Sequence, residues 1–328
     1  MADYKEIPKA IIINIIQEAK RTFVSEITSE PIPDTNGTPS DNLISSLRLL
    51  SSVATYLDTF LEAYPDATPR NTSDEPMTDD PFDDDEMDVE NVIPPVDPTV
   101  LKELFSSIPS LLQQKLSVPL IPFALETIND IAWTMTRIPD WEEWVVVASS
   151  FHEFAIPRIE GMISMGEDTL STFLGCIWAT AKTVPGAFSL DPDTIQLLED
   201  LYGRYPTAEF QVKVVGILGL AAMTESIETN KYITAFMMRQ IPSQAPWVVI
   251  EIMDSMMEIF ADGEKVYNTP VFVEGQLLTK LKQLMPRLRK KMKSIDPKKE
   301  SELRERADDV LENFVEFLKY KETEVKQK

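Results

Sequence analysis

The sequence has very little of the chemistry on which most enzymes and metal sites depend. Its 328 residues include one cysteine, Cys176, and one histidine, His152. One cysteine cannot close a disulfide within the chain, and zinc sites usually take three or four cysteine or histidine ligands. A chain without disulfides is typical of a reducing compartment. We therefore expect an intracellular protein with neither a disulfide nor a zinc site.

Glycine and long apolar runs are also scarce. The chain has 10 glycines against 24 prolines. This balance favours helices, because helices need few glycine turns and proline marks their ends. Apolar runs, such as Val145 to Ala148, are far shorter than the ~20 residues of a membrane-spanning helix. The first residues lack the basic and apolar segments of a secretory signal. We expect no contact with a membrane.

Positive charge is the third deficit. Lys and Arg number 31 against 54 Asp and Glu, which gives a net charge of −23. Phosphate attracts cationic surfaces, so this balance argues against nucleic acid as a direct partner. Eleven acidic residues and no basic one lie between Asn71 and Leu101. Prolines in the same stretch argue against a packed helix, and we predict an acidic flexible loop there.

The rest of the chain shows helical periodicity, and no segment alternates as a strand does. Two helices are expected within 8–29 and 41–61. The helix pairs expected after the loop are 99–115 with 117–138, 141–164 with 167–183, 191–203 with 207–224, 228–240 with 246–261, and 271–294 with 299–322. The second helices begin about 39 to 53 residues apart, close to the period of roughly 40–47 for HEAT or armadillo repeats.

These pairs predict an all-α fold, a HEAT/armadillo-like α-solenoid of stacked helix pairs. The second helices are almost wholly apolar or small, as in 174–179 and 214–221, which is typical of helices buried between neighbours. We expect three parts: N-terminal helices of the solenoid in 1–64, the acidic flexible loop in 65–98, and a HEAT-repeat solenoid in 99–328.

Several segments resemble one known family. They are Pro246-Trp247-Val248-Val249, Met253-Asp254-Ser255, Ile259-Phe260-Ala261-Asp262-Gly263 and Phe314-Val315-Glu316-Phe317 with Tyr320-Lys321-Glu322. Together with the helices around Gly175 and Gly216 and the acidic insertion, they resemble the C-terminal HEAT repeats of the symportin family. The resemblance covers roughly residues 42–322, and the Phe-Ala-Asp-Gly turn is its most specific piece.

The resemblance implies a non-enzymatic adaptor without a cofactor. Symportin-like proteins chaperone the two 5S-rRNA-binding proteins of the large ribosomal subunit. They escort this pair into the nucleus with an import receptor, so a protein that shuttles between cytoplasm and nucleus is implied. The family's N-terminal armadillo half and its basic segment before a proline-tyrosine pair do not occur in this sequence. Receptor binding is therefore expected through an N-terminal part that this chain lacks.

Two groups of residues are candidates for partner binding. The first group is the acidic side chains Asp79, Asp80, Asp83, Asp84, Asp85, Glu86, Asp88 and Glu90. They could screen the Lys/Arg surface of a ribosomal protein until it meets RNA, or they could form a solvated linker. A calcium site is disfavoured because the glycine of an EF-hand is missing and Pro81 interrupts the run. The second group is Asn129, Trp133 and Trp178, which could hold an extended peptide or fill the core.

The remaining motifs do not change the prediction that this chain is a binding protein. The basic stretch 280–299 has four possible interpretations: an RNA contact, a nuclear-localisation patch, a partner of the acidic loop, or a charged outer face of a helix pair. Ser149, His152 and Glu153 are too close on one helix to form a catalytic triad. We predict an adaptor for basic ribosomal proteins. The alternative is a HEAT-repeat scaffold subunit of a larger complex, with an apolar partner and salt-insensitive binding.

Overall fold

The computed structural model describes most of the chain. The described residues are 8–29, 39–69, 95–114, 116–138, 141–184, 188–242 and 244–327. Every regular element within these ranges is a helix, so the predicted all-α fold of stacked helices is confirmed. The chain divides into two compact units, Met1–Ala155 and Ile156–Lys328.

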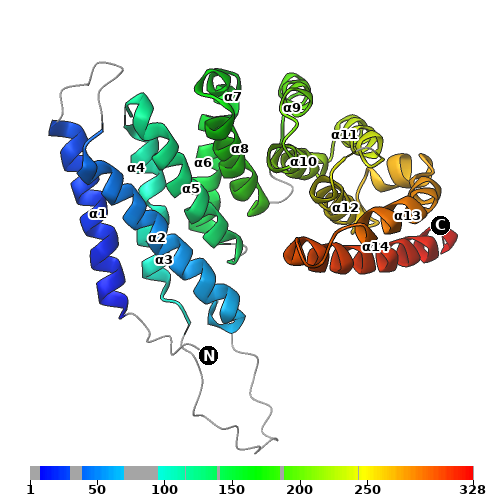
Figure 1. Cartoon of the computed structure of the whole chain (residues 1–328), viewed down its shortest axis with the longest axis horizontal. Helices are drawn as coiled ribbons and strands as arrows, with labels where there is room; N and C mark the ends of the chain where they lie inside the picture. The colour runs from blue at the N-terminus through cyan, green and yellow to red at the C-terminus, as the bar shows by residue number, and fades with distance from the viewer. Residues whose placement is uncertain are drawn as a thin grey trace, which may run out of the picture. The chain divides into compact units, whose positions relative to one another are not determined.

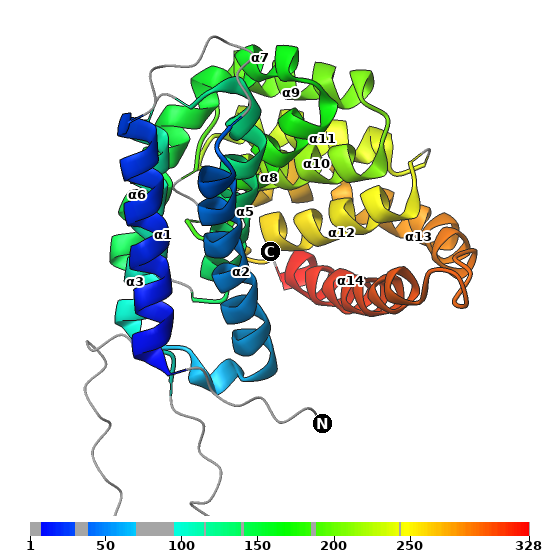
Figure 2. The ribbon, with the colours of Figure 1, turned by 60° about the vertical axis from the view of Figure 1, so that its left-hand side comes forward.

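Unit 1 is built around a pair of long helices. Its elements are α1 (Lys9–Ser29), α2 (Asp41–Ala63), η1 (Pro65–Ala67), α3 (Pro98–Phe105), α4 (Ser107–Gln113), η3 (Val118–Leu120), α5 (Ile121–Thr136) and α6 (Glu142–Ala155). α2 packs between α1 and α5 (Figures 1 and 2). Both helices expected before residue 64 are present. The Ser40 side chain accepts a hydrogen bond from the backbone N–H of Asn42 and so begins α2.

Unit 2 continues with alternating helices. Its elements are η4 (Ile156–Arg158), α7 (Ile159–Met162), η5 (Ile163–Met165), α8 (Glu167–Lys182), α9 (Pro192–Arg204), α10 (Ala208–Ala222), α11 (Ile227–Gln240), α12 (Pro246–Phe260), the π-helical η6 (Asn268–Val273), α13 (Leu277–Lys293) and α14 (Ser301–Gln327). The second helices α8, α10, α12 and α14 begin 38 to 55 residues apart.

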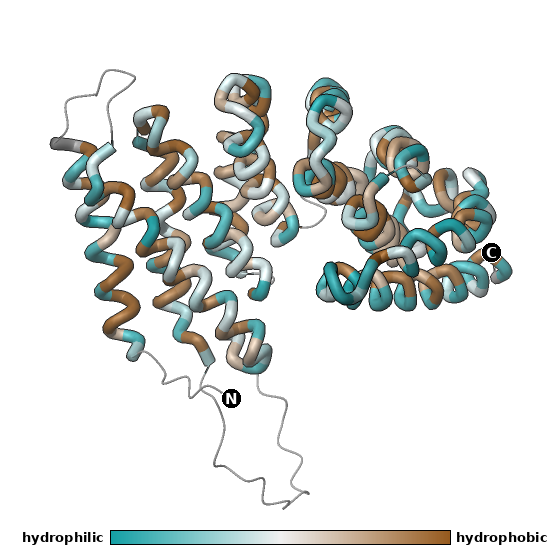
Figure 3. Tube along the Cα trace, in the orientation of Figure 1, coloured by the Kyte–Doolittle hydropathy of each residue, from teal (hydrophilic) through white to brown (hydrophobic). Residues whose placement is uncertain are grey.

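The second helices of unit 2 lie side by side in the order α8, α10, α12, α14, and we call them the inner layer (Figure 1). The first helices α9, α11 and α13 each pack against a member of this layer. Every residue from 214 to 222 in α10 is buried, as expected for a helix apolar on all sides. In contrast, hydrophobic and hydrophilic bands alternate along α14 (Figure 3), which is typical of an amphipathic helix.

Three of the expected helices are shorter or broken. The helix predicted over 99–115 is divided at Ser106 into α3 and α4. The helix predicted over 141–164 stops at Ala155 and continues as 3-10 turns and the short α7. Pro157 explains the break, because it lacks a backbone N–H and disfavours helical geometry in the residue before it. The helix predicted from 271 begins at Leu277 instead. Gln276 precedes this helix in the left-handed region, with φ of 56°. It therefore belongs neither to η6 nor to α13.

The turn after α12 is held by a buried polar cluster. The Asn268 side-chain amide donates to the carbonyl oxygen of Gly263 at 3.1 Å, and Tyr267 donates to the carbonyl oxygen of Ile259 at 3.0 Å. Lys321 of α14 is fully buried and donates to Glu324 at 2.7 Å. This cluster joins the Phe-Ala-Asp-Gly turn to the last helix.

Candidate functional site

Three carboxylates form a row along α12, which lies between α10 and α14. Glu251, Asp254 and Glu258 are spaced three and four residues apart, which places them on one side of the helix. Their exposed side-chain fractions are 6%, 27% and 47%, respectively. This α12 acidic row therefore begins in the interior of unit 2 and ends at its surface.

Burial raises the pKa of all three carboxyl groups. The pKa of Glu251 rises from 4.5 to about 7. The pKa values of Asp254 and Glu258 also rise, and burial is again the largest cause. Loss of water disfavours the charged form of an acid. Part of the row therefore binds protons near neutral pH, and a cation that arrives beside it would favour their release.

Two cations from other helices of the inner layer oppose this rise in the pKa of Glu251. Arg306 of α14 places Nη2 3.2 Å from Glu251 Oε2 and 3.2 Å from Asp254 Oδ2. Lys182 of α8 places Nζ 3.9 Å from Glu258 Oε1. Three carboxylates thus face two cations, and the fully ionised row keeps an excess of negative charge.

Each of these cations also lies against an indole ring. The Lys182 Nζ is 5.8 Å from the centre of the Trp178 ring, and the Arg306 Cζ is 5.9 Å from the centre of the Trp247 ring. Such distances allow cation–π attraction. Trp247 is 37% exposed, whereas Trp178 is only 9% exposed. The surface therefore presents acids and aromatic rings together.

Glycines in α10 allow this surface to form across the inner layer. A Cβ atom on Gly216 would lie 2.2 Å from Cε2 of Trp178, far inside van der Waals contact. A Cβ atom on Gly219 would lie 2.7 Å from Oγ of Ser255 in α12. The absence of side chains at these two positions lets the Trp178 ring lie directly over α10 and lets α10 approach α12 closely.

This arrangement suits the binding of basic side chains. Guanidinium groups pair with carboxylates through two hydrogen bonds and stack on aromatic faces, so an acidic and aromatic surface complements arginine in particular. In the described part of the chain, no cluster of His, Cys, Asp and Glu could hold a metal ion. Cys176 is buried within α8.

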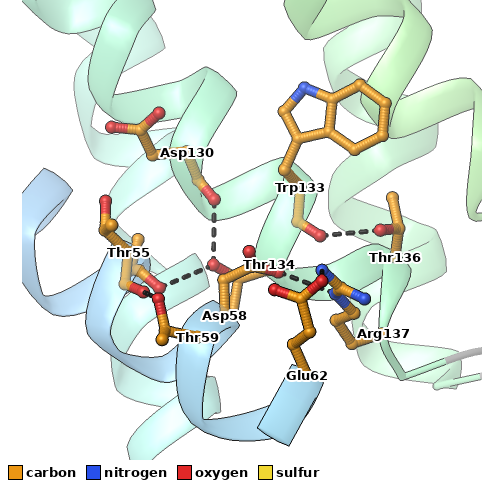
Figure 4. A network of polar contacts seen from close by, with 10 residues as sticks. Thr55, Asp58, Thr59, Glu62, Asp130, Trp133, Thr134, Thr136 and Arg137 are labelled. Carbon is orange, nitrogen blue, oxygen red and sulfur yellow. Dashed lines mark hydrogen bonds and ion pairs between the residues drawn. The ribbon is translucent and has the colours of Figure 1, made fainter. Parts of the chain in front are cut away.

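Unit 1 contains a different polar seam, between α2 and α5 (Figure 4). Thr134 donates to the carbonyl oxygen of Ala54 at 2.9 Å, and Thr127 donates to that of Leu47 at 3.1 Å. Arg137 donates to Asp58 at 2.9 Å at the end of α5. The equal seven-residue spacing of both threonines and both acceptors fixes the register of the two helices.

Comparison with known proteins places these features in a family. A family described as "SYO1-like, TPR repeats" matches residues 141–325, which is more than half of the chain. The chain belongs to this family. The resemblance to the symportin family is thereby confirmed, and the matched region includes the inner layer and the α12 acidic row.

Three curated relatives of this SYO1-like chain are found, and two of them are named for transport or import. "Symportin 1" of Chaetomium thermophilum is 26% identical over 60% of the chain and 33% of its own length. "Synchronized import protein 1" of Saccharomyces cerevisiae is 32% identical over 46% and 27%, respectively. "Armadillo repeat protein involved in nucleocytoplasmic transport Syo2" of Schizosaccharomyces pombe is 24% identical over 61% and 32%. The aligned part of this chain spans about a third of the length of these relatives.

The three candidate residues on helices lie in both units of the SYO1-like chain. Asn129 and Trp133 are half-buried on α5 of unit 1. The Trp133 ring points away from the contact between Asp58 and Arg137 (Figure 4). Trp178 is in unit 2, next to Lys182 and over Gly216. Their part in partner binding stays a prediction.

The acidic residues from Asp79 to Glu90 lie outside the described residues, so their contribution also stays a prediction. The α12 acidic row, in turn, was missed by the sequence reasoning. A signal was present, because Glu251, Asp254 and Glu258 are the only charged residues of an otherwise apolar helix. In the buried layer of a solenoid, charges at such spacing indicate a functional surface.

In the part of the chain that the structure describes, no helix is long and apolar enough to span a membrane.

Proposed function

We propose that this chain is a non-enzymatic adaptor that binds basic ribosomal proteins, in particular the 5S-rRNA-binding pair of the large subunit, and accompanies them between cytoplasm and nucleus. The observation that carries the proposal is the α12 acidic row, with its flanking tryptophans, inside the region that matches the family. The names of two relatives, which mention nucleocytoplasmic transport and import, support a transport role. Recruitment of an import receptor belongs to the proposal for a longer protein.

The proposed mechanism is an exchange of cations. In the free protein, Arg306 and Lys182 lie between the acidic row and the two indole rings. Both cations are at least partly exposed, so they can move out when the Lys and Arg side chains of a client arrive. The client then gains carboxylates that are already desolvated, where electrostatic attraction is stronger than in bulk water. The acidic run 74–90 adds long-range attraction that speeds the encounter.

A binding experiment with matched variants tests this role. The triple variant Glu251→Gln, Asp254→Asn and Glu258→Gln removes the charge of the row. The control variant Asp193→Asn, Glu225→Gln and Glu228→Gln removes three exposed carboxylates elsewhere in unit 2. Purified 5S-rRNA-binding proteins are presented to each chain at low and at moderate salt. We expect the row variant to lose at least tenfold in affinity and the control variant to bind as the wild type does.

Three results would count against the proposal. Absence of selective binding at moderate salt would remove the ribosomal client. Binding that ignores both salt and the charge of the row would favour the alternative function, a scaffold subunit with an apolar partner. Equal losses in both variants would assign the attraction to net charge instead of the α12 acidic row.

A further inference from the structure

The solvent side of α13 is strongly basic in a chain whose net charge is −23. Lys280, Arg287, Lys290 and Lys293 are all exposed on this helix, and we call them the α13 basic face. The opposite side of the helix is buried through Leu281, Leu288, Met292 and their neighbours. No acidic residue occurs between Leu277 and Ile295. The whole-chain charge therefore conceals a local surface of the opposite sign.

The four cations of this face are not used within the described part of the chain. Lys282, on the same helix, pairs with Glu322 at 2.7 Å, and Lys291 donates to the carbonyl oxygen of Ile241 at 3.4 Å. The α13 basic face has no such ion pair or hydrogen bond among the described residues. The four side chains are thus available to a partner, and they cover ~20 Å of helix at ~1.5 Å per residue.

The composition of the face indicates which kind of anion it fits. Protein interfaces usually contain buried aromatic or aliphatic anchors, and none of the exposed large hydrophobic residues in the described chain lies on α13. Binding of single-stranded nucleic acid uses aromatic rings on which bases stack, and α13 contains no aromatic residue. Contacts to a duplex backbone need only cations that reach phosphates.

We propose that the α13 basic face binds the phosphate backbone of double-stranded RNA, without reading its sequence. This inference does not depend on the client proposed for the α12 acidic row, because the two surfaces have opposite charge and different residues. The chain's negative charge elsewhere weakens attraction at long range, so binding is local and most evident at low salt. An adaptor with both surfaces could hold a basic protein and a folded RNA at once.

The test measures binding of the full chain to a short blunt RNA duplex of arbitrary sequence. One variant carries Lys280→Gln, Arg287→Gln, Lys290→Gln and Lys293→Gln. The matched control carries Arg204→Gln, Lys231→Gln, Lys265→Gln and Lys319→Gln, four exposed cations elsewhere in unit 2. Circular dichroism establishes that both variants fold. A single-stranded RNA and a polyglutamate peptide serve as competing anions.

We expect the duplex to bind the wild type and the control variant, and to bind the face variant at least tenfold more weakly. If about four phosphates are neutralised, doubling the salt concentration should lower the wild-type affinity about 12-fold, because log K falls by about 0.9 per phosphate for each tenfold rise in salt. Absence of duplex binding, or equal losses in both variants, would overturn the proposal. Tighter binding of polyglutamate than of the duplex would also overturn it and assign the face to an acidic protein.

Discussion

Replacement of Glu251 by glutamine should make the protein more stable at neutral and alkaline pH. Glu251 is buried in α12, and its pKa rises from 4.5 to about 7 because burial disfavours the carboxylate. The difference corresponds to about 3 kcal/mol, since each tenfold change in proton affinity is worth about 1.4 kcal/mol. Glutamine keeps an oxygen that can accept a hydrogen bond from Arg306, but it has no proton to lose.

The pH window follows from the raised pKa. Below pH 4.5, Glu251 is protonated in both the folded and the unfolded chain, and it carries no penalty. Between pH 4.5 and about 7, the unfolded chain loses the proton while the folded chain retains it, so the wild type loses stability as pH rises. Above this window the full penalty of about 3 kcal/mol applies. The advantage of the glutamine variant should therefore grow across the window and then level off.

Urea unfolding at a series of pH values measures this difference. The control is Glu312→Gln, an exposed carboxylate on α14 that removes the same charge. The surrounding groups Asp254, Glu258, Lys182 and Arg306 remain in every protein, so their titration largely cancels in the comparison. A constant difference between Glu251→Gln and the wild type over the whole window would refute the reasoning. So would a carbon-13 titration of the Glu251 carboxyl group with a midpoint near pH 4.5.

Three further predictions concern packing and binding. Gly216→Ala should lower the free energy of unfolding by about 1–3 kcal/mol in a denaturation assay, because its Cβ would collide with the buried Trp178 ring. The control Gly203→Ala, near the end of α9, has open space around its Cβ. It should be neutral or stabilising by up to about 1 kcal/mol in the same assay. Thr134→Val should cost about 1 kcal/mol through loss of the bond to Ala54, whereas Thr55→Val, exposed on α2, should cost less; equal costs would contradict the proposed role of the seam. The affinity for a basic client should rise between about pH 6 and 8 in calorimetric titrations, because ionised Glu251 is the form that binds cations; an affinity that falls over this range would exclude the exchange at the α12 acidic row.

Most helix boundaries of unit 2 could be predicted because the sequence marks them locally. Asp191 accepts a hydrogen bond from the backbone N–H of Thr194 at 2.8 Å, with proline at the first helical position of α9. Pro246 marks the start of α12 in the same way. The break of the helix after Ala155 was predictable in principle from Pro157. Periodicity alone does not reveal this break, because the apolar spacing continues past Pro157.

The site was harder to predict because its parts come from separate helices. Arg306 follows Glu251 by 55 residues and reaches it only because α14 packs beside α12. Lys182 likewise approaches the row across α10. Periodicity reports which helices are buried, but these ion pairs depend on the stacking order of the layer. Trp178 could be singled out as a tryptophan of a buried helix, whereas its link through Lys182 to Glu258 of α12 could not be predicted.

The buried polar cluster around Gly263 has a consequence for how relatives of this protein are recognised. The Phe-Ala-Asp-Gly string ties the end of α12 to the buried lysine and glutamate of α14. The motif therefore reports the packing of the last helix against the end of α12. It does not identify a binding partner. Two proteins could share this motif and bind different partners, because the carboxylates proposed to select a partner, the α12 acidic row, lie outside the motif. Under the function proposed for the α12 acidic row, sorting such proteins by the acidic positions of that helix would separate them by the basic partner that each binds.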